Sequence, residues 1–183
     1  MSRAKVKRWV FLGIFFVLAI LTMCCIGCSS ESSGEPSVTP DGLSVAPIVG
    51  ALAPGFTLPT TDGQTVKLDE LKGQPVLLTF WTTKCGACHS QVPYLQAAFE
   101  EKGQEVKFIA INIGESSDAV QQYAENEGVG FTVALDSDAT AARAYNIRYI
   151  PNNFLIDNQG VIKYIKIGAF PNTDELLAML DDL

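Results

Sequence analysis

A short apolar stretch followed by two cysteines constrains the fold of this chain more than any other feature. Residues 76–81 are Val-Leu-Leu-Thr-Phe-Trp, and such a run of apolar and β-branched side chains is typical of a strand buried on both faces. Cys85 and Cys88 come after a three-residue link. Apolar side chains then recur at helical spacing, as at Leu95 and Phe99. The pattern predicts a strand that leads directly into a helix, with the Cys-x-x-Cys pair at the junction.

This placement has chemical consequences for the two sulfur atoms. The first turn of a helix presents unpaired backbone N–H groups and the positive end of the helix dipole, and both favour a thiolate over a thiol. Cys85 lies nearer the strand end, so we expect it to be the nucleophile, with Cys88, one turn into the helix, as the resolving thiol. The spacing also allows the two sulfurs to close a disulfide. The pair is therefore predicted to be a redox-active dithiol.

Two other uses of the same cysteines compete with this prediction. A zinc site needs four ligands, whereas the chain beyond residue 28 offers no second Cys-x-x-Cys and a single histidine, His89. The sequence Cys-Gly-Ala-Cys-His also matches covalent c-type haem attachment, with His89 as the iron ligand. The strand-to-helix context favours the dithiol. We therefore expect no metal and no cofactor, and a His89 that is either solvated or a modest cationic influence on the dithiol.

The N-terminus is predicted to be a targeting or anchoring segment rather than part of the fold. Four basic residues precede Trp9, and the eighteen residues from Trp9 onward carry no charge, which places the N-terminus in the cytoplasm and the body outside. Residues 1–28 are then either a lipoprotein signal, with Cys28 lipidated after cleavage, or an uncleaved membrane anchor. The segment 29–49 is rich in Ser, Pro and Gly and is expected to be a flexible tether. The folded domain, 50–183, would be held at the extracytoplasmic face of a bacterial cytoplasmic membrane.

Cysteine usage and charge narrow the function classes further. Of the five cysteines, only Cys85 and Cys88 follow the targeting segment, which leaves no second, structural disulfide. An exported domain with a single such pair is expected to be redox-active rather than stapled. Beyond Cys28, nine basic residues stand against twenty acidic ones, a net charge of −11 that would repel nucleic acid. We expect a monomer that contacts the membrane only through its N-terminus.

Alternating strand and helix patterns predict the architecture of the domain. They indicate an α/β fold, a three-layer sandwich with a mixed central sheet and an N-terminal β-hairpin extension. The expected elements are a first hairpin at 56–58 and 65–67, strands at 76–81, 106–113 and 131–135, a closing hairpin at 153–156 and 161–167, and helices at 68–71, 85–102, 117–127, 138–145 and 173–183.

These motifs, in this order, resemble the thioredoxin superfamily, and within it the TlpA/ResA-like, membrane-anchored thiol–disulfide oxidoreductases with an AhpC/TSA-type redoxin domain. The resemblance runs from about Ala53 to Leu183. It rests on Phe-Trp-x-x-x-Cys-x-x-Cys with a proline five residues later, and on the segments Ala-Pro-Gly-Phe-Thr-Leu (53–58), Asp-Glu-Leu-Lys-Gly-Gln-Pro (69–75), Asn-Ile-Gly-Glu-Ser (112–116) and Ile-Pro-Asn-Asn-Phe-Leu-Ile-Asp (150–157).

The resemblance implies a thioredoxin-like fold and supporting roles for residues around the dithiol. Pro151 matches the family's cis-proline, which lies against the two cysteines and presents the backbone of Ile150 as an edge for a substrate strand. Trp81 matches the aromatic residue near the dithiol, and Lys84 stands where thioredoxins carry a second tryptophan. Glu115 matches a family carboxylate near the site.

Two neutral residues depart from the family pattern. Thr79 occupies the position of the buried acid of thioredoxins, and Gln91 a position at which ResA-like proteins carry glutamate. Proton transfer to the resolving thiol then needs another route, and Glu115 is the best remaining acid–base candidate.

The function we expect is that of a tethered thiol–disulfide oxidoreductase that reduces disulfides in exported proteins, with apocytochrome c as one client suggested by the resemblance. Gly86 and Ala87, between the cysteines, offer no cationic or hydrogen-bonding side chain, so thiolate stabilisation should be moderate and the pair should act as a reductant. Electrons would come from a membrane thiol relay, because we recognise no site for NADPH or flavin in the chain.

Two alternatives remain open from the sequence. A peroxiredoxin is the alternative enzyme, because Thr82-x-x-Cys85 fits part of that pattern. The expected proline before Thr82 is absent, however, and Cys88 lies too close to be a typical resolving cysteine of a peroxidase. A haem- or metal-binding electron carrier or chaperone is the alternative from another class.

Overall fold

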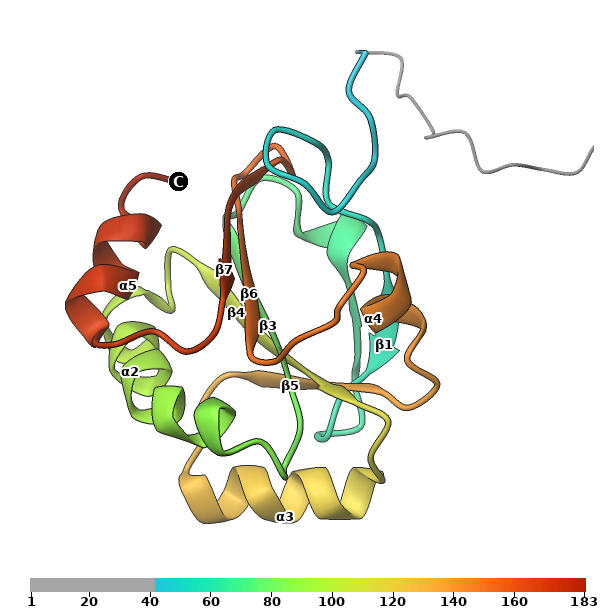
Figure 1. Cartoon of the computed structure of the whole chain (residues 1–183), viewed down its shortest axis with the longest axis vertical. Coiled ribbons are helices and arrows are strands. Elements are labelled where there is room, and N and C mark those ends of the chain that lie inside the picture. The colour runs from blue at the N-terminus through green and yellow to red at the C-terminus, as the bar shows by residue number, and fades with distance from the viewer. Residues whose placement is uncertain (1–41) are drawn as a thin grey trace, which may run out of the picture. The chain divides into compact units, whose positions relative to one another are not determined.

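A mixed five-stranded sheet forms the centre of residues 42–183, the part of the chain that this computed structural model describes (Figure 1). From one edge to the other its strands are β5 (Thr132–Asp136), β4 (Lys107–Ile113), β3 (Val76–Trp81), β6 (Asn152–Ile156) and β7 (Ile162–Ile167). β3 and β5 pair in parallel with β4, whereas β6 runs antiparallel to both β3 and β7. The carboxyl ends of β3 and β4 and the beginning of β6 therefore lie at the same end of the sheet.

Each face of the sheet is covered by its own hydrophobic core. One core joins Leu77 of β3 to side chains of α2 (Gly86–Lys102), α3 (Ser117–Glu127) and α5 (Thr173–Leu180). The other joins Leu78 to the hairpin of β1 (Thr57–Pro59) and β2 (Thr65–Lys67), the 3₁₀ helix η1 (Leu68–Leu71) and α4 (Thr140–Ala144). Leu77 and Leu78 reach different cores because successive side chains of a strand point to opposite faces.

The predicted α/β sandwich, its mixed sheet and its N-terminal hairpin are confirmed. Most elements begin and end within two residues of the predicted bounds. The last helix is shorter than expected and ends at Leu180 rather than 183. The Ala-rich helix α4 is also shorter, because Ala139 takes a left-handed conformation (φ 57°) immediately before it. Pro93 lies inside α2, which continues to Lys102.

Ordered contacts begin before the predicted domain boundary at residue 50. The N–H of Leu52 donates to the carbonyl of Ser44 at 3.0 Å, and the N–H of Gly50 donates to the carbonyl of Ile162 at 2.9 Å. These backbone hydrogen bonds hold the loop 44–52 beside β7. Because backbone groups rather than a periodic apolar pattern carry these contacts, the composition of the segment did not indicate them.

The predicted targeting segment, 1–28, and the tether as far as residue 41 lie outside the described residues. Within 42–183, no helix combines the length and apolar character needed to cross a bilayer.

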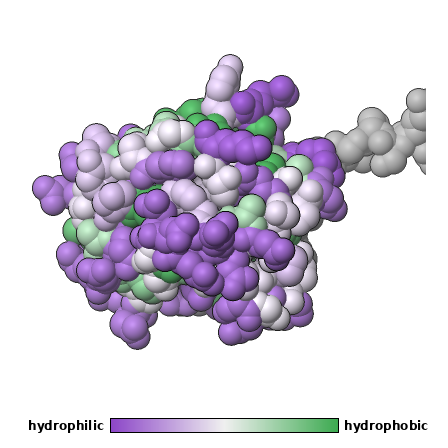
Figure 2. Space-filling view, turned by 90° about the horizontal axis from the view of Figure 1, so that it is seen from below, coloured by the Kyte–Doolittle hydropathy of each residue, from purple (hydrophilic) through white to green (hydrophobic). Residues whose placement is uncertain are grey.

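The outer side of α3 is a polar surface. Its buried side chain is Val120, whereas Gln121, Gln122 and Glu125 are exposed. Figure 2 views the molecule from below Figure 1, the side on which α3 lies, and this face is mainly hydrophilic.

Candidate active site

Cys85 and Cys88 form a disulfide at the junction of β3 and α2, with their Cα atoms 5.2 Å apart. Cys85 is the N-cap residue of α2, and its Sγ accepts a hydrogen bond from the backbone N–H of Cys88 at 3.1 Å. The N–H groups of Cys88 and His89 also donate to the Cys85 carbonyl, at 3.0 and 3.1 Å. The Cys85 sulfur therefore lies where the peptide dipoles of the first helical turn favour negative charge.

The two sulfurs differ in accessibility. Cys88 is 2% exposed and packs in the core beneath α2, where Trp81 and Leu95 belong to the same cluster. Cys85 is half-buried, and the next residues, Gly86 and Ala87, are exposed. A large partner can approach Cys85, whereas Cys88 can react only with an atom already held at the site.

Glu115 fixes the loop that leads into Cys85. Its carboxylate accepts hydrogen bonds from the Thr83 N–H, the Thr83 hydroxyl and the Asn112 side-chain amide, each at 2.7 Å. Burial acts to raise the pKa of Glu115, but these hydrogen bonds and the charge of Lys84 outweigh it, so the pKa lies below its ordinary value. An ionised carboxylate with both oxygens occupied suits the anchoring of a loop. The acid–base role expected for Glu115 stays a prediction that these contacts do not favour.

His89 lies against this same loop rather than over the sulfurs. Its Nε2 lies 2.8 Å from the carbonyl oxygen of Thr83, and its ring centroid lies 4.9 Å from that of Tyr123. The ring centroid of Trp81 also lies 4.9 Å from that of Tyr123, so Tyr123 contacts both rings. Burial, with a smaller contribution from the charge of Glu127, raises the pKa of Tyr123 to about 12, so Tyr123 stays protonated at physiological pH. His89 and Lys84 are both exposed.

Pro151 lies at the same end of the sheet as the dithiol. Phe80 pairs with Asn152, so the register places Pro151 beside the carboxyl end of β3, from which the chain continues to Cys85. Ile150 and Cys85 both pack against the core that includes Cys88. The Ile150–Pro151 peptide bond is cis, as predicted.

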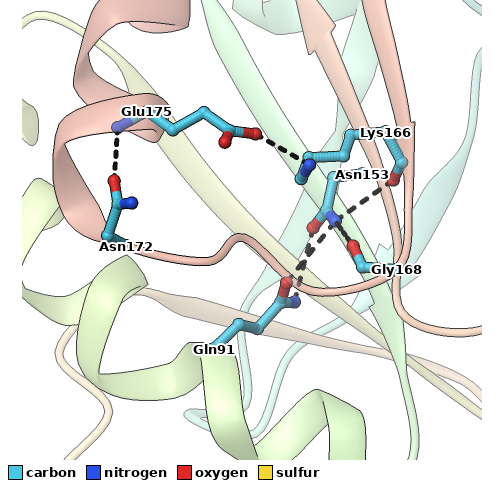
Figure 3. Close-up of polar contacts among 6 residues, drawn as sticks. All are labelled: Gln91, Asn153, Lys166, Gly168, Asn172 and Glu175. Atoms are coloured by element: carbon cyan, nitrogen blue, oxygen red, sulfur yellow. Dashed lines mark hydrogen bonds and ion pairs between the residues drawn. The ribbon is translucent and has the colours of Figure 1, made fainter.

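A buried polar cluster beneath the dithiol was not predicted. Gln91 of α2 is 1% exposed and its Nε2 donates to the Thr79 hydroxyl at 2.9 Å. It also faces Asn153 of β6, which is fully buried (Figure 3). The two neutral departures, Thr79 and Gln91, are therefore in direct contact. Asn153 follows Asn152 at the beginning of β6, and a polar residue at the start of a buried strand was the signal that could have indicated the third member.

Cavities larger than the one beside Cys88 lie away from the dithiol. A cavity of about 250 Å³ lined by Leu52, Val76 and Ile156 lies at the opposite end of β3. The cavity beside Cys88 holds only about 20 Å³. Among residues 42–183, no three His, Cys, Asp or Glu side chains gather as a metal ion would require. The reactive feature of this end of the sheet is the half-buried Cys85 rather than a deep pocket.

Comparisons with known proteins agree with this geometry. Residues 49–165 match the model of the AhpC/TSA family. The chain is 33% identical over 179 residues to the thiol-disulfide oxidoreductase ResA of Bacillus subtilis (strain 168). The aligned region covers 94% of this chain and 92% of that protein. A secreted Mycobacterium tuberculosis disulfide oxidoreductase homologous to E. coli DsbE superposes with a TM-score of 0.65 at 25% identity, over 70% of this chain and 96% of that chain. StoA from Bacillus subtilis superposes with a TM-score of 0.61 at 26% identity, over 68% and 95% of the two chains.

Proposed function

Since the chain belongs to the AhpC/TSA family and, within the thioredoxin superfamily, to the ResA-like thiol-disulfide oxidoreductases, we propose that Cys85 and Cys88 are its catalytic dithiol and that it reduces disulfides in exported proteins. The observation that carries this proposal is the asymmetry of the two sulfurs. Cys85 is accessible and accepts a backbone N–H, whereas Cys88 is buried one helical turn away. Such an arrangement suits one attacking and one resolving sulfur.

The reaction takes two exchanges. The Cys85 thiolate attacks one sulfur of the client disulfide, and the other client sulfur leaves as a thiolate that takes a proton from solvent. Cys88, once deprotonated, attacks Cys85 Sγ and breaks the mixed disulfide, releasing the first client sulfur. The client gains two electrons, and the chain ends with the Cys85–Cys88 disulfide that this structure contains.

The surrounding residues act by holding this geometry. Glu115 holds the N–H of Thr83 and His89 contacts its carbonyl oxygen, which together set the position of the loop that leads to Cys85. Trp81 fills the core beneath the junction, and Lys84 contributes positive charge at its surface. The backbone around Pro151 offers the edge on which the client strand pairs.

We place the domain at the extracytoplasmic face of the bacterial cytoplasmic membrane. The support is the uncharged stretch that begins at Trp9 and the basic residues before it. Lipid on Cys28 or an uncleaved 1–28 segment would tether it, and the linker predicted at 29–49 would end where the ordered loop 44–52 begins. A membrane thiol relay would return electrons to the dithiol, and apocytochrome c, with an oxidised Cys-x-x-Cys, is the client that the family resemblance suggests.

Single cysteine variants test the assignment. Cys85→Ser should abolish reduction of oxidised glutathione and of protein disulfides, whereas Cys88→Ser should still attack and should accumulate mixed disulfides detectable by mass spectrometry. Ser90→Ala, at an exposed neighbouring position, is the control and should leave both steps unchanged. If Cys88→Ser reacts poorly and Cys85→Ser reacts well, the two roles are reversed.

The two alternatives call for separate measurements on the same protein. Consumption of hydrogen peroxide faster than reduction of glutathione disulfide would favour the peroxiredoxin. A haem absorbance band or bound metal in the purified chain would favour the electron carrier or chaperone. We expect neither.

A further inference from the structure

We propose that Gln91 and Asn153 are positioning residues of the dithiol reaction, an amide pair that holds the helical turn of Cys88 against the strand that follows Pro151. This inference rests on the proposed function, because it assigns the pair to one of its two steps. The step is the attack of Cys88 on the mixed disulfide at Cys85.

Gln91 lies on the same side of α2 as Cys88, one turn further along the helix. Both side chains are buried, and together with Thr79 they line the small cavity of about 20 Å³. The Nε2 group of Gln91 donates to the Thr79 hydroxyl at 2.9 Å and lies 3.4 Å from Asn153 Oδ1. The turn of helix that carries Cys88 is thereby joined to two adjacent strands, β3 and β6.

Asn153 connects Gln91 to the end of β7, the edge strand next to β6. Its Nδ2 donates to the carbonyls of Lys166 and Gly168, at 3.2 and 3.1 Å, and lies 3.5 Å from Gln91 Oε1 (Figure 3). The N–H of Gly168 in turn donates to the carbonyl of Pro151 at 2.8 Å. The cluster therefore fixes the position of Cys88 relative to the segment on which the client would lie.

The same strand end also anchors the closing helix. The ammonium group of Lys166 pairs with Glu175 at 2.7 Å, and the side chain of Asn172 caps α5 by accepting the Glu175 N–H at 2.8 Å (Figure 3). β7 is thus held from two sides, and its end gives Asn153 a fixed pair of acceptors.

The chemistry of amides explains why these residue types suit the position. Each amide supplies both donors and acceptors, so two facing amides and one hydroxyl can satisfy one another in the core without a charge. Replacing either amide by an apolar side chain leaves the buried amide oxygen of the other without its donor, which is more costly than losing an exposed hydrogen bond. The cluster resists small displacements of the helical turn for the same reason.

Only the second step of the reaction depends on this cluster. Cys85 lies at the N-cap, outside the cluster, and its loop is held by Glu115. Attack on the client therefore does not require Gln91. Release requires the buried Cys88 sulfur to reach Cys85 Sγ while Cys85 carries the client, and a small error in position slows such a step steeply.

Gln91→Met, which keeps the length of the side chain and removes the amide, separates the two steps. Attack is measured as mixed-disulfide formation with oxidised glutathione in the Cys88→Ser background. Release is measured in the reduced dithiol protein as decay of the glutathione mixed disulfide after rapid quenching. We expect release to slow about tenfold, which corresponds to about 1.4 kcal/mol, with attack unchanged. Gln96→Met, the same substitution further along α2 and away from the dithiol, should change neither rate.

An exchange of the two amides supplies the rescue. Gln91→Asn shortens the helix side of the pair and should slow release, and adding Asn153→Gln lengthens the strand side and should restore part of the rate. This series also serves if Gln91→Met fails to fold. Unchanged release in Gln91→Met or Gln91→Asn, or an equal loss of attack and release, would overturn the proposal. Failure of the unsubstituted chain to attack glutathione disulfide would instead overturn the proposed function.

Discussion

Glu115 illustrates how a single carboxylate can hold a reactive loop in place. It lies 32 residues beyond Thr83 in the sequence, yet its two oxygens accept the backbone N–H and the hydroxyl of that residue. Hydrogen bonds to an ionised carboxylate are stronger than those between neutral groups. The residue that was expected to move protons is therefore, by its contacts, an anchor for the peptide two residues before Cys85.

Glu115→Gln tests this anchor through its dependence on pH. The variant should lose about 1–2 kcal/mol in the free energy of unfolding at pH 7, because an amide cannot accept from all three donors. The pKa of Glu115 is lowered in the folded state, so the stability that its charge contributes is fully present above its ordinary value of 4.5 and is lost as the pH falls through the lower folded value. Urea unfolding from pH 7 to pH 3 should show the gap between the two proteins shrinking below pH 4.5.

The matched control is Asp118→Asn, which removes an exposed carboxylate near the beginning of α3. It should change the free energy of unfolding by less than about 0.5 kcal/mol. A gap between wild type and Glu115→Gln that stays constant down to pH 3 would contradict the anchoring role.

At the scale of elements, α4 is a short helix that depends on side chains outside it. It has five residues, too few to be stable on backbone hydrogen bonds alone. The fully buried Asp136, at the end of β5, accepts the N–H groups of Ala141 and Ala142 at 3.1 and 2.8 Å. The exposed Asp138 accepts the N–H of Thr140 at 3.1 Å. The element thus begins where two carboxylates satisfy its free N–H groups, which an Ala-rich pattern could not locate.

Asp136→Ala should destabilise the domain by about 2 kcal/mol, because it leaves two buried N–H groups of α4 without acceptors. Asp138→Ala should cost clearly less, since water can replace the lost acceptor at an exposed site. Chemical denaturation of the two variants side by side measures the difference. Equal losses would show that burial of the capping carboxylate does not matter here.

At the scale of the whole molecule, the sequence predicted the layers and the reactive pair because short local patterns of residues indicate both. The apolar run at 76–81 and the two cysteines after it define the central strand and its junction with α2. The contact between Gln91 and Asn153 joins residues 62 apart, and no local pattern indicates it. The loop 44–52 was likewise missed, because its backbone hydrogen bonds leave no trace in composition.

Truncation tests where the domain begins. A chain that starts at residue 43 should be soluble and monomeric and should unfold cooperatively, because the two cores draw on residues after it. A chain that starts at residue 53 should have a lower Tm, since it loses the hydrogen bonds from Gly50 to Ile162 and from Leu52 to Ser44. Sedimentation and thermal unfolding measure both properties. Equal Tm values for the two chains would mean that the loop contributes nothing to stability.

The reduction potential of the Cys85–Cys88 pair, measured by equilibration with glutathione or dithiothreitol, tests the central claim most directly. A strong oxidant requires a heavily stabilised thiolate. The Cys85 sulfur receives the N–H of Cys88, but Gly86 and Ala87 add no cationic side chain, and the net charge of −11 beyond Cys28 opposes further negative charge. We therefore predict a two-electron couple nearer to thioredoxin, at about −270 mV, than to DsbA, at about −120 mV. A value at or above about −150 mV would contradict the account and make this chain a disulfide-forming enzyme.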